Sequence, residues 1–237
     1  MTVQLLALDD AVGLVLPAAS ADAVRARLQM YRLRSKIELA IDPNFSVSAH
    51  AEDSVREALH AAGSLPSEGP LSVAAGSGLV CRRLAEQTIE ICGAADAFAA
   101  AAIDAAAGVD PVDWDRARIL AGLVEIDVDT TERFTPHMIN LDRVDAISFS
   151  KGCYTGQEVV ARTENLGRVK RRINRYRLQG HSARSGERLR DDDREIGEIV
   201  NAAGDVCLAL VPIDRHDSTL RVGNGTAQPL GLPYPID

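Results

Sequence analysis

Residues 147–162 have the sequence ISFSKGCYTGQEVVAR. This stretch is the most informative part of the chain for its fold and its function. An apolar run typical of the end of a strand passes through Lys151 and a glycine into a predicted helix. Thr155 and Glu158 fit the capping box, in which one side chain caps the helix start and a carboxylate follows three residues later. Cys153 is therefore expected two residues before the start of a helix.

Cys153 is the main candidate for chemistry. The amino end of a helix carries a partial positive charge, and Lys151 lies two positions from the thiol. Both favour the thiolate, which is the reactive form of cysteine. The alternative is that Cys153 is a small buried hydrophobic residue, as free cysteines often are. Glu158 and Arg162, four residues apart, can pair along one face of the helix.

The other three cysteines fit an apolar core. They lie in apolar, strand-like stretches, and the chain has no C-x-x-C pair or other metal-ribbon spacing. The histidines are scattered, so we expect no metal site made by the protein alone, and we expect reduced thiols. These core cysteines are Cys81, Cys92 and Cys207.

The pattern of apolar residues and glycines changes after Gly167. Short alternating segments separated by glycines follow, which is typical of a small antiparallel β-barrel or sandwich. We therefore predict an α+β fold, with two-layer ferredoxin-like α/β units over residues 1–166 and a C-terminal antiparallel β-barrel over residues 167–237.

Strands and helices are interspersed in the first of these domains. A helix is expected to start at Ser20, and a long ordered loop is expected over residues 125–143. Apolar patterns predict strands at 3–8, 13–16, 34–41, from 47 onward, and at 71–73, 79–84 and 88–91, with further helices at 53–62, 94–107 and 114–123.

Length and composition narrow the class of protein. The chain has 237 residues, 46% hydrophobic and 25% charged, which is typical of a globular protein. No apolar stretch is long enough to span a membrane, and residues 1–10 lack the pattern of a secretory signal. We therefore expect a cytoplasmic protein, and we expect a monomer.

The net charge of −8 disfavours general binding to nucleic acids. Residues 151–190 differ from the rest, with eleven basic and three acidic residues. Within them, residues 168–177 are interpreted as a strand whose cations alternate between its two faces. The charge then forms no single stripe, so a solvated strand is favoured over a nucleic-acid contact.

A resemblance rests on the same motif. Residues 151–158, KGCYTGQE, followed by Val160-Ala161-Arg162, match the signature K-G-C-Y-x-G-Q-E-x-x-A-R. On this motif the chain resembles the YgfZ-type folate-binding proteins. Further landmarks of that family occur in order along nearly the whole chain: residues 118–122 (RILAG), Phe134-Thr135-Pro136, Asn140-Leu141 and Leu232-Pro233-Tyr234.

The resemblance implies both a fold and a role. The family is similar in fold to the T-protein of the glycine cleavage system, which is arranged around tetrahydrofolate. The implied role is that of a folate-dependent accessory protein for assembly or repair of iron-sulfur enzymes, including tRNA-modifying ones, with Cys153 as the key thiol. Its implied cofactor-binding residues are Lys151, Gly152, Tyr154, Gln157, Glu158 and Arg162.

The implied partners are folate and iron-sulfur client enzymes or assembly proteins, without direct nucleic-acid binding and without a membrane. The basic run at residues 168–177 can alternatively meet the polyglutamate tail of folate, because flexible cations suit a string of carboxylates.

Two departures from the family pattern bear on folate. Family chains usually carry about 80 further residues ahead of the point where this chain starts, so we expect the folate-binding-type domain to lack them. The family commonly has Glu before the Ala-Gly landmark, where this chain has Leu120, which cannot accept hydrogen bonds. The alternative function, a tetrahydrofolate-dependent aminomethyltransferase-like enzyme, is expected to need a carboxylate near the folate.

Overall fold

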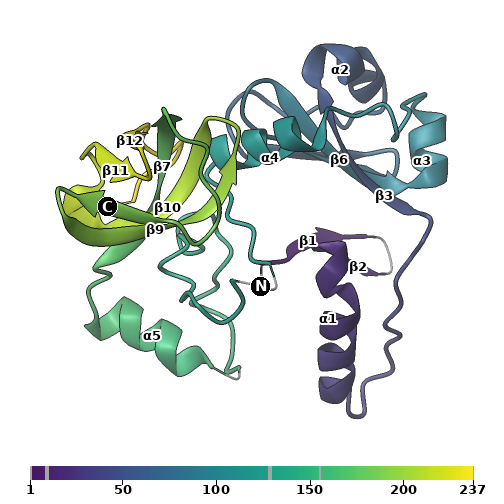
Figure 1. Ribbon diagram of the computed structural model, residues 1–237. Helices are drawn as coiled ribbons and strands as arrows, with labels where there is room; N and C mark the ends of the chain where they lie inside the picture. The colour runs from purple at the N-terminus through teal and green to yellow at the C-terminus, as the bar shows by residue number, and fades with distance from the viewer. Residues whose placement is uncertain (1, 9–10, 128–129, 155, 237) are drawn as a thin grey trace. The chain divides into compact units, whose positions relative to one another are not determined.

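The computed structural model describes residues 2–8, 11–127, 130–154 and 156–236 (Figure 1). The chain divides into two compact units, which are described separately. The first consists of residues 1–110 and 125–131, and the second of residues 111–124 and 132–237.

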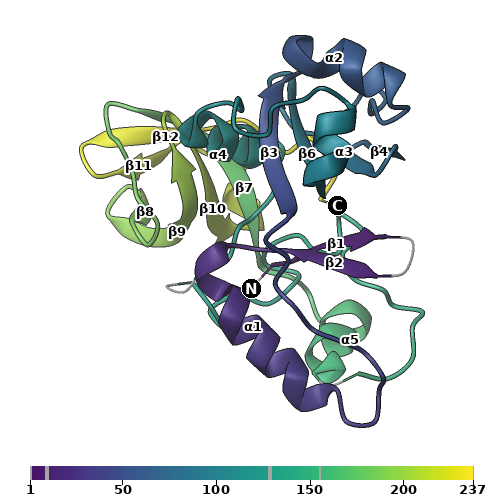
Figure 2. The same cartoon turned by 90° about the vertical axis from the view of Figure 1, so that its right-hand side faces the viewer.

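The first unit contains a four-stranded antiparallel sheet (Figure 2). Apolar residues alternate along its two inner strands, so that Cys81 and Ile91, which face each other in the register, both point into the core. In order across the sheet, the strands are β3 (Phe45–Ala51), β6 (Thr88–Ala94), β5 (Leu79–Arg83) and β4 (Val73–Gly76).

Two helices continue directly from strands of this sheet, α2 (Glu52–Ala61) from β3 and α3 (Ala95–Ala100) from β6. Val55 and Leu59, one helical turn apart on α2, are both buried in the core of the sheet. The buried carboxylate of Glu52 in the first turn forms ion pairs with Arg56, at 2.8 Å, and with Arg83 of β5. The start of α2 is therefore held on the sheet by charge as well as by apolar packing.

The first unit begins with a hairpin and a helix. Strands β1 (Gln4–Ala7) and β2 (Val12–Val15) pair with each other in a two-stranded sheet, and α1 (Ala18–Tyr31) follows. No residue of α1 is buried. Among the described residues, the chain contains no helix that is both long and apolar enough to cross a membrane.

The second unit contains a closed antiparallel barrel, preceded in the chain by α4 (Pro111–Leu120) and α5 (Gln157–Leu166). Closure leaves the sheet without free edges. The strands, in order around the barrel, are β10 (Val206–Pro212), β7 (Arg171–Gln179), β12 (Gly225–Pro229), β11 (Leu220–Val222), β8 (Arg188–Asp191) and β9 (Arg194–Ala203), and a short 3-10 helix, η1 (Ile213–Arg215), follows β10.

Alternating side chains fill the barrel. Tyr176 and Leu178 of β7 point inward with Cys207 of β10, and all three are buried. Gly197 of β9 allows close approach, since a Cβ atom there would lie 2.7 Å from Cγ1 of Val211. The remaining buried members of this core are Leu189, Ile199, Ala209, Val211, Leu220, Val222 and Ala227.

The mixed α/β fold with a C-terminal barrel confirms the predicted fold class. Residues 34–41, however, form no strand, because no strand in the described part of the chain pairs with them and alternation alone does not make a sheet. The helix expected over 94–107 ends at Ala100, where turns replace the helical geometry that the alanines favour.

The start of the motif helix also differs from the expectation. Helix α5 begins at Gln157, and Gly156 occupies its N-cap position with a left-handed φ of 87°. Thr155, the expected cap, lies outside the described residues.

The first barrel strand begins at Arg171, close to the expected boundary at residue 167. The second compact unit also contains residues 111–124 and the segment from 132 onward. The division into domains at residue 167 therefore stays a prediction.

Candidate functional site

The motif segment lies in the second unit, immediately before and within α5. Cys153 is exposed, whereas Cys81, Cys92 and Cys207 are buried. The core interpretation is thus correct for those three, and Cys153 is not the buried hydrophobic residue that the alternative required. Cys153 is the one cysteine of the chain that solvent reaches.

Contacts within the motif fix the turn that leads into α5. Nζ of Lys151 lies 4.4 Å from the centroid of the Tyr154 ring, a cation–π arrangement. The backbone N–H of Tyr154 donates a hydrogen bond to Oε1 of Gln157 over 3.0 Å. Gln157 thereby stabilises the loop.

The remaining motif candidates are exposed. A Cβ atom at Gly152 would meet nothing within 4 Å, so this glycine is not required by packing. Glu158 and Arg162 are exposed on α5. The structure therefore brings Lys151, Tyr154 and Gln157 together around the exposed cysteine loop, and leaves the side chains of Glu158 and Arg162 in solvent.

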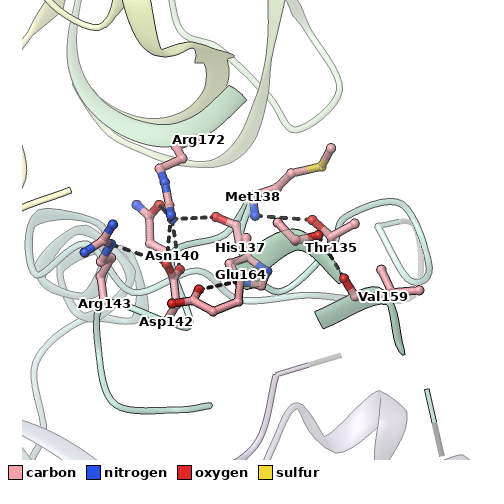
Figure 3. A network of polar contacts seen from close by, with 10 residues as sticks. Thr135, His137, Met138, Asn140, Asp142, Arg143, Val159, Glu164 and Arg172 are labelled. Atoms are coloured by element: carbon pink, nitrogen blue, oxygen red, sulfur yellow. Dashed lines mark hydrogen bonds and ion pairs between the residues drawn. The ribbon is translucent and has the colours of Figure 1, made fainter. Parts of the chain in front are cut away.

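A largely buried polar network connects the motif helix, the loop over residues 135–143 and strand β7 (Figure 3). Arg172 of β7 forms a bidentate pair with Asp142, with nitrogen–oxygen distances of 2.9 and 2.7 Å. Nη1 of Arg172 also donates to the carbonyl oxygen of His137 at 2.8 Å. Asn140 donates from Nδ2 to the carbonyl oxygen of Ile173 at 3.0 Å. The loop that contains Asp142 is therefore fastened to the first barrel strand.

Asp142 shows how the network changes the chemistry of its members. Burial is the largest influence and opposes ionisation of this carboxyl group. The hydrogen bonds and the positive charge of Arg172 together outweigh burial, so the pKa of Asp142 lies below its usual value. The Asp142 carboxyl group is therefore ionised at neutral pH.

His137 connects this network to α5. Its Nε2 lies 3.3 Å from Oε2 of Glu164, and its ring lies 6.4 Å from that of Phe149 between centroids. The His137 side chain is buried, and its Nδ1 has no hydrogen-bond partner among the described residues. Neither His137 nor Glu164 was singled out by the sequence, because contacts between residues 27 positions apart leave no local pattern.

The Ala-Gly landmark and the closing Leu-Pro-Tyr landmark meet in space. The Tyr234 hydroxyl donates to the carbonyl oxygen of Gly122 over 2.8 Å. Gly122 has φ of 73°, and a Cβ atom there would lie 2.8 Å from Cε1 of Tyr234. Arg175 of β7 donates to the carbonyl oxygens of Leu120 and Gly231. These landmarks therefore join three distant segments of the second unit.

The basic run over residues 168–177 is not a solvated strand. Arg172 is buried, and Ile173 and Tyr176 are fully buried. The barrel core covers one face of β7, and at the edge of the strand the backbone N–H of Ile173 donates to the carbonyl oxygen of Met138 at 2.9 Å. Arg177, near the end of the run, pairs with Asp205 at 3.5 Å. Several of the arginines in this run therefore stabilise the second unit.

Tetrahydrofolate is the cofactor that the resemblance implies. The pterin end requires a hydrogen-bond acceptor, and the side chain of Leu120 is apolar and buried. The glutamate end carries carboxylates, which the exposed cations Lys151 and Arg162 suit. The described residues thus fit the anionic end of a folate and do not fit its pterin at position 120, so we derive no chemical step through folate.

The fold and these landmarks define the chain as a mixed α/β protein with a closed C-terminal barrel and an exposed cysteine loop. Residues 170–231 match the family model "CAF17, C-terminal beta-barrel domain". A search of solved structures finds the glycine cleavage system aminomethyltransferase T from Bartonella henselae, with a TM-score of 0.57 and 17% identity, covering 97% of this chain and 70% of that one. At this identity the likeness concerns the fold alone.

Curated relatives are similar to this chain in sequence. The tRNA-modifying protein YgfZ of Serratia proteamaculans is 40% identical over 100 residues, 42% of this chain and 30% of the relative. The protein of that name from Yersinia enterocolitica is 36% identical over 141 residues, 52% of this chain and 42% of the relative. The chain thus matches less than half the length of these relatives. Together the comparisons confirm the resemblance to the YgfZ-type family.

Proposed function

We propose that this chain is a folate-dependent accessory protein that supports assembly or repair of iron-sulfur enzymes, including tRNA-modifying ones. The observation that carries the proposal is the exposure of Cys153 within the motif, while the other three cysteines are buried. The curated relatives named tRNA-modifying proteins support the link to tRNA modification. In this proposal Cys153 is the working thiol.

An accessory role suits a single thiol. An iron-sulfur cluster is usually held by four ligands, so Cys153 alone can only share or transiently bind one. In the described ranges, no three His, Cys, Asp or Glu side chains gather as a metal site requires. A client enzyme or an assembly protein must therefore supply the remaining ligands, and the exposed cysteine loop is the surface that it meets.

The neighbouring motif residues have supporting roles in this proposal. Lys151, held over the Tyr154 ring, places a cation on the cysteine loop and favours an anionic ligand there. Lys151 and Arg162 suit the glutamate end of folate, and the hydrogen bond between Tyr154 and Gln157 shapes the loop. Gly152 and Glu158, exposed beside them, are free to contact folate in this proposal. The aminomethyltransferase-like alternative rests on fold likeness alone, and position 120 lacks the carboxylate it is expected to need.

The test is complementation in a bacterial strain that lacks its own YgfZ-type protein. Cys153→Ser should fold normally and fail to restore the activity of an iron-sulfur tRNA-modifying enzyme, read as modified nucleoside in total tRNA. The matched control is Cys153→Ser with Ser150→Cys, which returns a thiol to the same loop at the wrong position. This control should also fail. Full complementation by Cys153→Ser would overturn the assignment of Cys153.

Folate is tested separately by titration calorimetry with tetrahydrofolate. Weak binding is expected, because Leu120 offers the pterin no acceptor, and Lys151→Gln should weaken it further. A micromolar or tighter dissociation constant that is insensitive to Lys151→Gln would show that folate binds elsewhere.

A further inference from the structure

A cationic segment in the first unit takes no part in the site described above. Residues 25–36 contain five basic residues and no acidic one, in a chain whose net charge is −8. The segment covers the second half of α1 and the turn that follows it. We call it the α1 cationic segment; its cations are Arg25, Arg27, Arg32, Arg34 and Lys36.

Within the described part of the chain, Arg25 is the one cation of this segment that forms an ion pair with a carboxylate. Arg25 pairs with Asp22 at 2.9 Å, but both side chains are at least half exposed, so the pair is weak. Arg32 donates to the carbonyl oxygen of Ile37 at 3.3 Å, which leaves its charge uncompensated. The other three cations form no ion pair with a described carboxylate. In contrast, the second unit uses Arg133, Arg172 and Arg188 in ion pairs with Asp or Glu.

An aromatic ring lies among the cations. The guanidinium of Arg27 is 5.2 Å from the centroid of the Tyr31 ring, at the end of α1. Tyr31 is 54% exposed. An exposed ring with an arginine beside it is the arrangement on which the bases of single-stranded nucleic acids stack.

The turn after α1 exposes an apolar side chain at a strained position. Leu33 has φ of 44°, a left-handed conformation that favours glycine at the end of a helix. Its side chain is 87% exposed, so folding gains little from it. A hollow in the surface is lined by Leu33, Arg34 and Ser35. Strain and apolar exposure in one turn are typical of a binding surface.

We propose that the α1 cationic segment binds single-stranded nucleic acid, with the arginines and Lys36 on phosphates and Tyr31 stacked on a base. Charge complementarity selects a polyanion, and the exposed ring selects one with accessible bases. An anionic membrane fits less well, because few of the 14 residues of α1 are large and apolar, and an interfacial helix needs a broad apolar face to insert into a bilayer.

The net charge of −8 describes the whole chain and does not exclude a local cationic surface. Residues 168–177, where nucleic-acid contact is disfavoured, are a different segment, and several of their arginines have structural partners. The α1 cationic segment lies in the other compact unit and shares no residue with the motif. Nucleic-acid binding here is therefore independent of the proposed function, and either can fail without the other.

The experiment measures fluorescence anisotropy of labelled oligouridylate and oligothymidylate, about ten nucleotides long, across a salt series. The test variant is Arg32→Gln with Arg34→Gln and Lys36→Gln. The control is Arg168→Gln with Lys170→Gln and Arg190→Gln, which removes the same charge from exposed positions in the second unit. Circular dichroism checks that both variants are folded.

The test variant should bind at least about tenfold more weakly at low salt, and the slope of log K against log salt should fall by about 2, because about 0.7 ions are released per phosphate contact. Tyr31→Ala should weaken binding about fivefold or more without changing the slope. A preference for oligouridylate supports the proposal with RNA as the natural source, and a preference for oligothymidylate supports it with single-stranded DNA as the source. Equal binding supports binding through phosphates and stacked bases, which both polymers share.

Three results would overturn it. The natural chain binds neither oligonucleotide at low salt; the control loses as much affinity as the test variant; or the test variant loses only its sedimentation with phosphatidylserine vesicles while oligonucleotide binding is unchanged. The last result would assign the segment to a membrane surface.

Discussion

Oε2 of Glu164 lies 3.3 Å from Nε2 of His137, and this contact joins the motif helix to a loop 27 residues earlier in the chain (Figure 3). His137 is buried, whereas 47% of the Glu164 side chain is exposed. The same loop is bound to the barrel strand β7 through Arg172. The cysteine loop is therefore positioned through side chains as well as through the backbone.

Glu164→Ala should release α5 without unfolding the second unit. Amide hydrogen exchange over residues 157–166 should become faster, while exchange in the barrel stays unchanged. The free energy of unfolding should fall by less than about 1 kcal/mol, because the carboxylate is half exposed. Glu158→Ala, on the same helix, is the control. Equal exchange in the two variants would show that the His137 contact does not hold the helix.

Arg172→Leu should destabilise the second unit strongly. The substitution leaves the carboxylate of Asp142 buried without its partner, which typically costs about 3–5 kcal/mol. Arg168→Leu removes an exposed cation from the segment just before β7 and should change the free energy of unfolding by less than about 0.5 kcal/mol. Urea denaturation measures both. Similar midpoints for the two variants would mean that the buried pair contributes little.

The pH dependence of stability should reveal the Asp142 carboxyl group. Its pKa is lower in the folded chain than in the unfolded one, where it is about 3.9. The resulting stabilisation is present above the unfolded pKa and is lost as the pH falls through the folded pKa. The stability difference between the natural chain and Asp142→Asn should therefore shrink below about pH 4. A difference that stays constant into acid would contradict this assignment.

Gly122→Ala should destabilise the second unit by about 1–3 kcal/mol, because alanine is strained at φ of 73° and its Cβ would collide with Tyr234. Gly152→Ala is the matched control, since nothing lies within 4 Å of a Cβ atom there. Tyr234→Phe should cost about 1 kcal/mol through loss of the hydrogen bond to Gly122. Thermal denaturation distinguishes these outcomes, and equal melting temperatures for the two glycine variants would refute the close contact.

Maleimide labelling of the native chain should modify Cys153 first. Burial raises the pKa of Cys81 to about 11 and that of Cys207 to about 12, so these thiols stay protonated at neutral pH. Cys92 is buried and should also be protected. Peptide mass spectrometry measures the order. Labelling of Cys207 at neutral pH as fast as that of Cys153 would show that Cys207 is not buried in the barrel.

The sequence predicted the C-terminal barrel because its short strands alternate apolar and polar residues and end at glycines. Both signals are local, so they can be recognised without knowing which strands pair. It also separated Cys153 from the three core cysteines, because the surroundings of each differ along the chain itself. It was wrong for residues 34–41, where an alternating pattern has no strand to pair with. A strand requires a partner, and local pattern does not supply one.

The sequence by itself determined the fold class, the motif around Cys153 and the order of the landmarks along the chain, whereas the exposure of Cys153 came from the structure. Only the tertiary structure decided what the landmarks do: Arg172 became a buried partner of Asp142, His137 a tether for α5, and Gly122 the acceptor of the Tyr234 hydroxyl. These roles depend on contacts between residues 27 to 112 positions apart. Burial and pairing of a charged side chain arise from such neighbours, which no local pattern can specify.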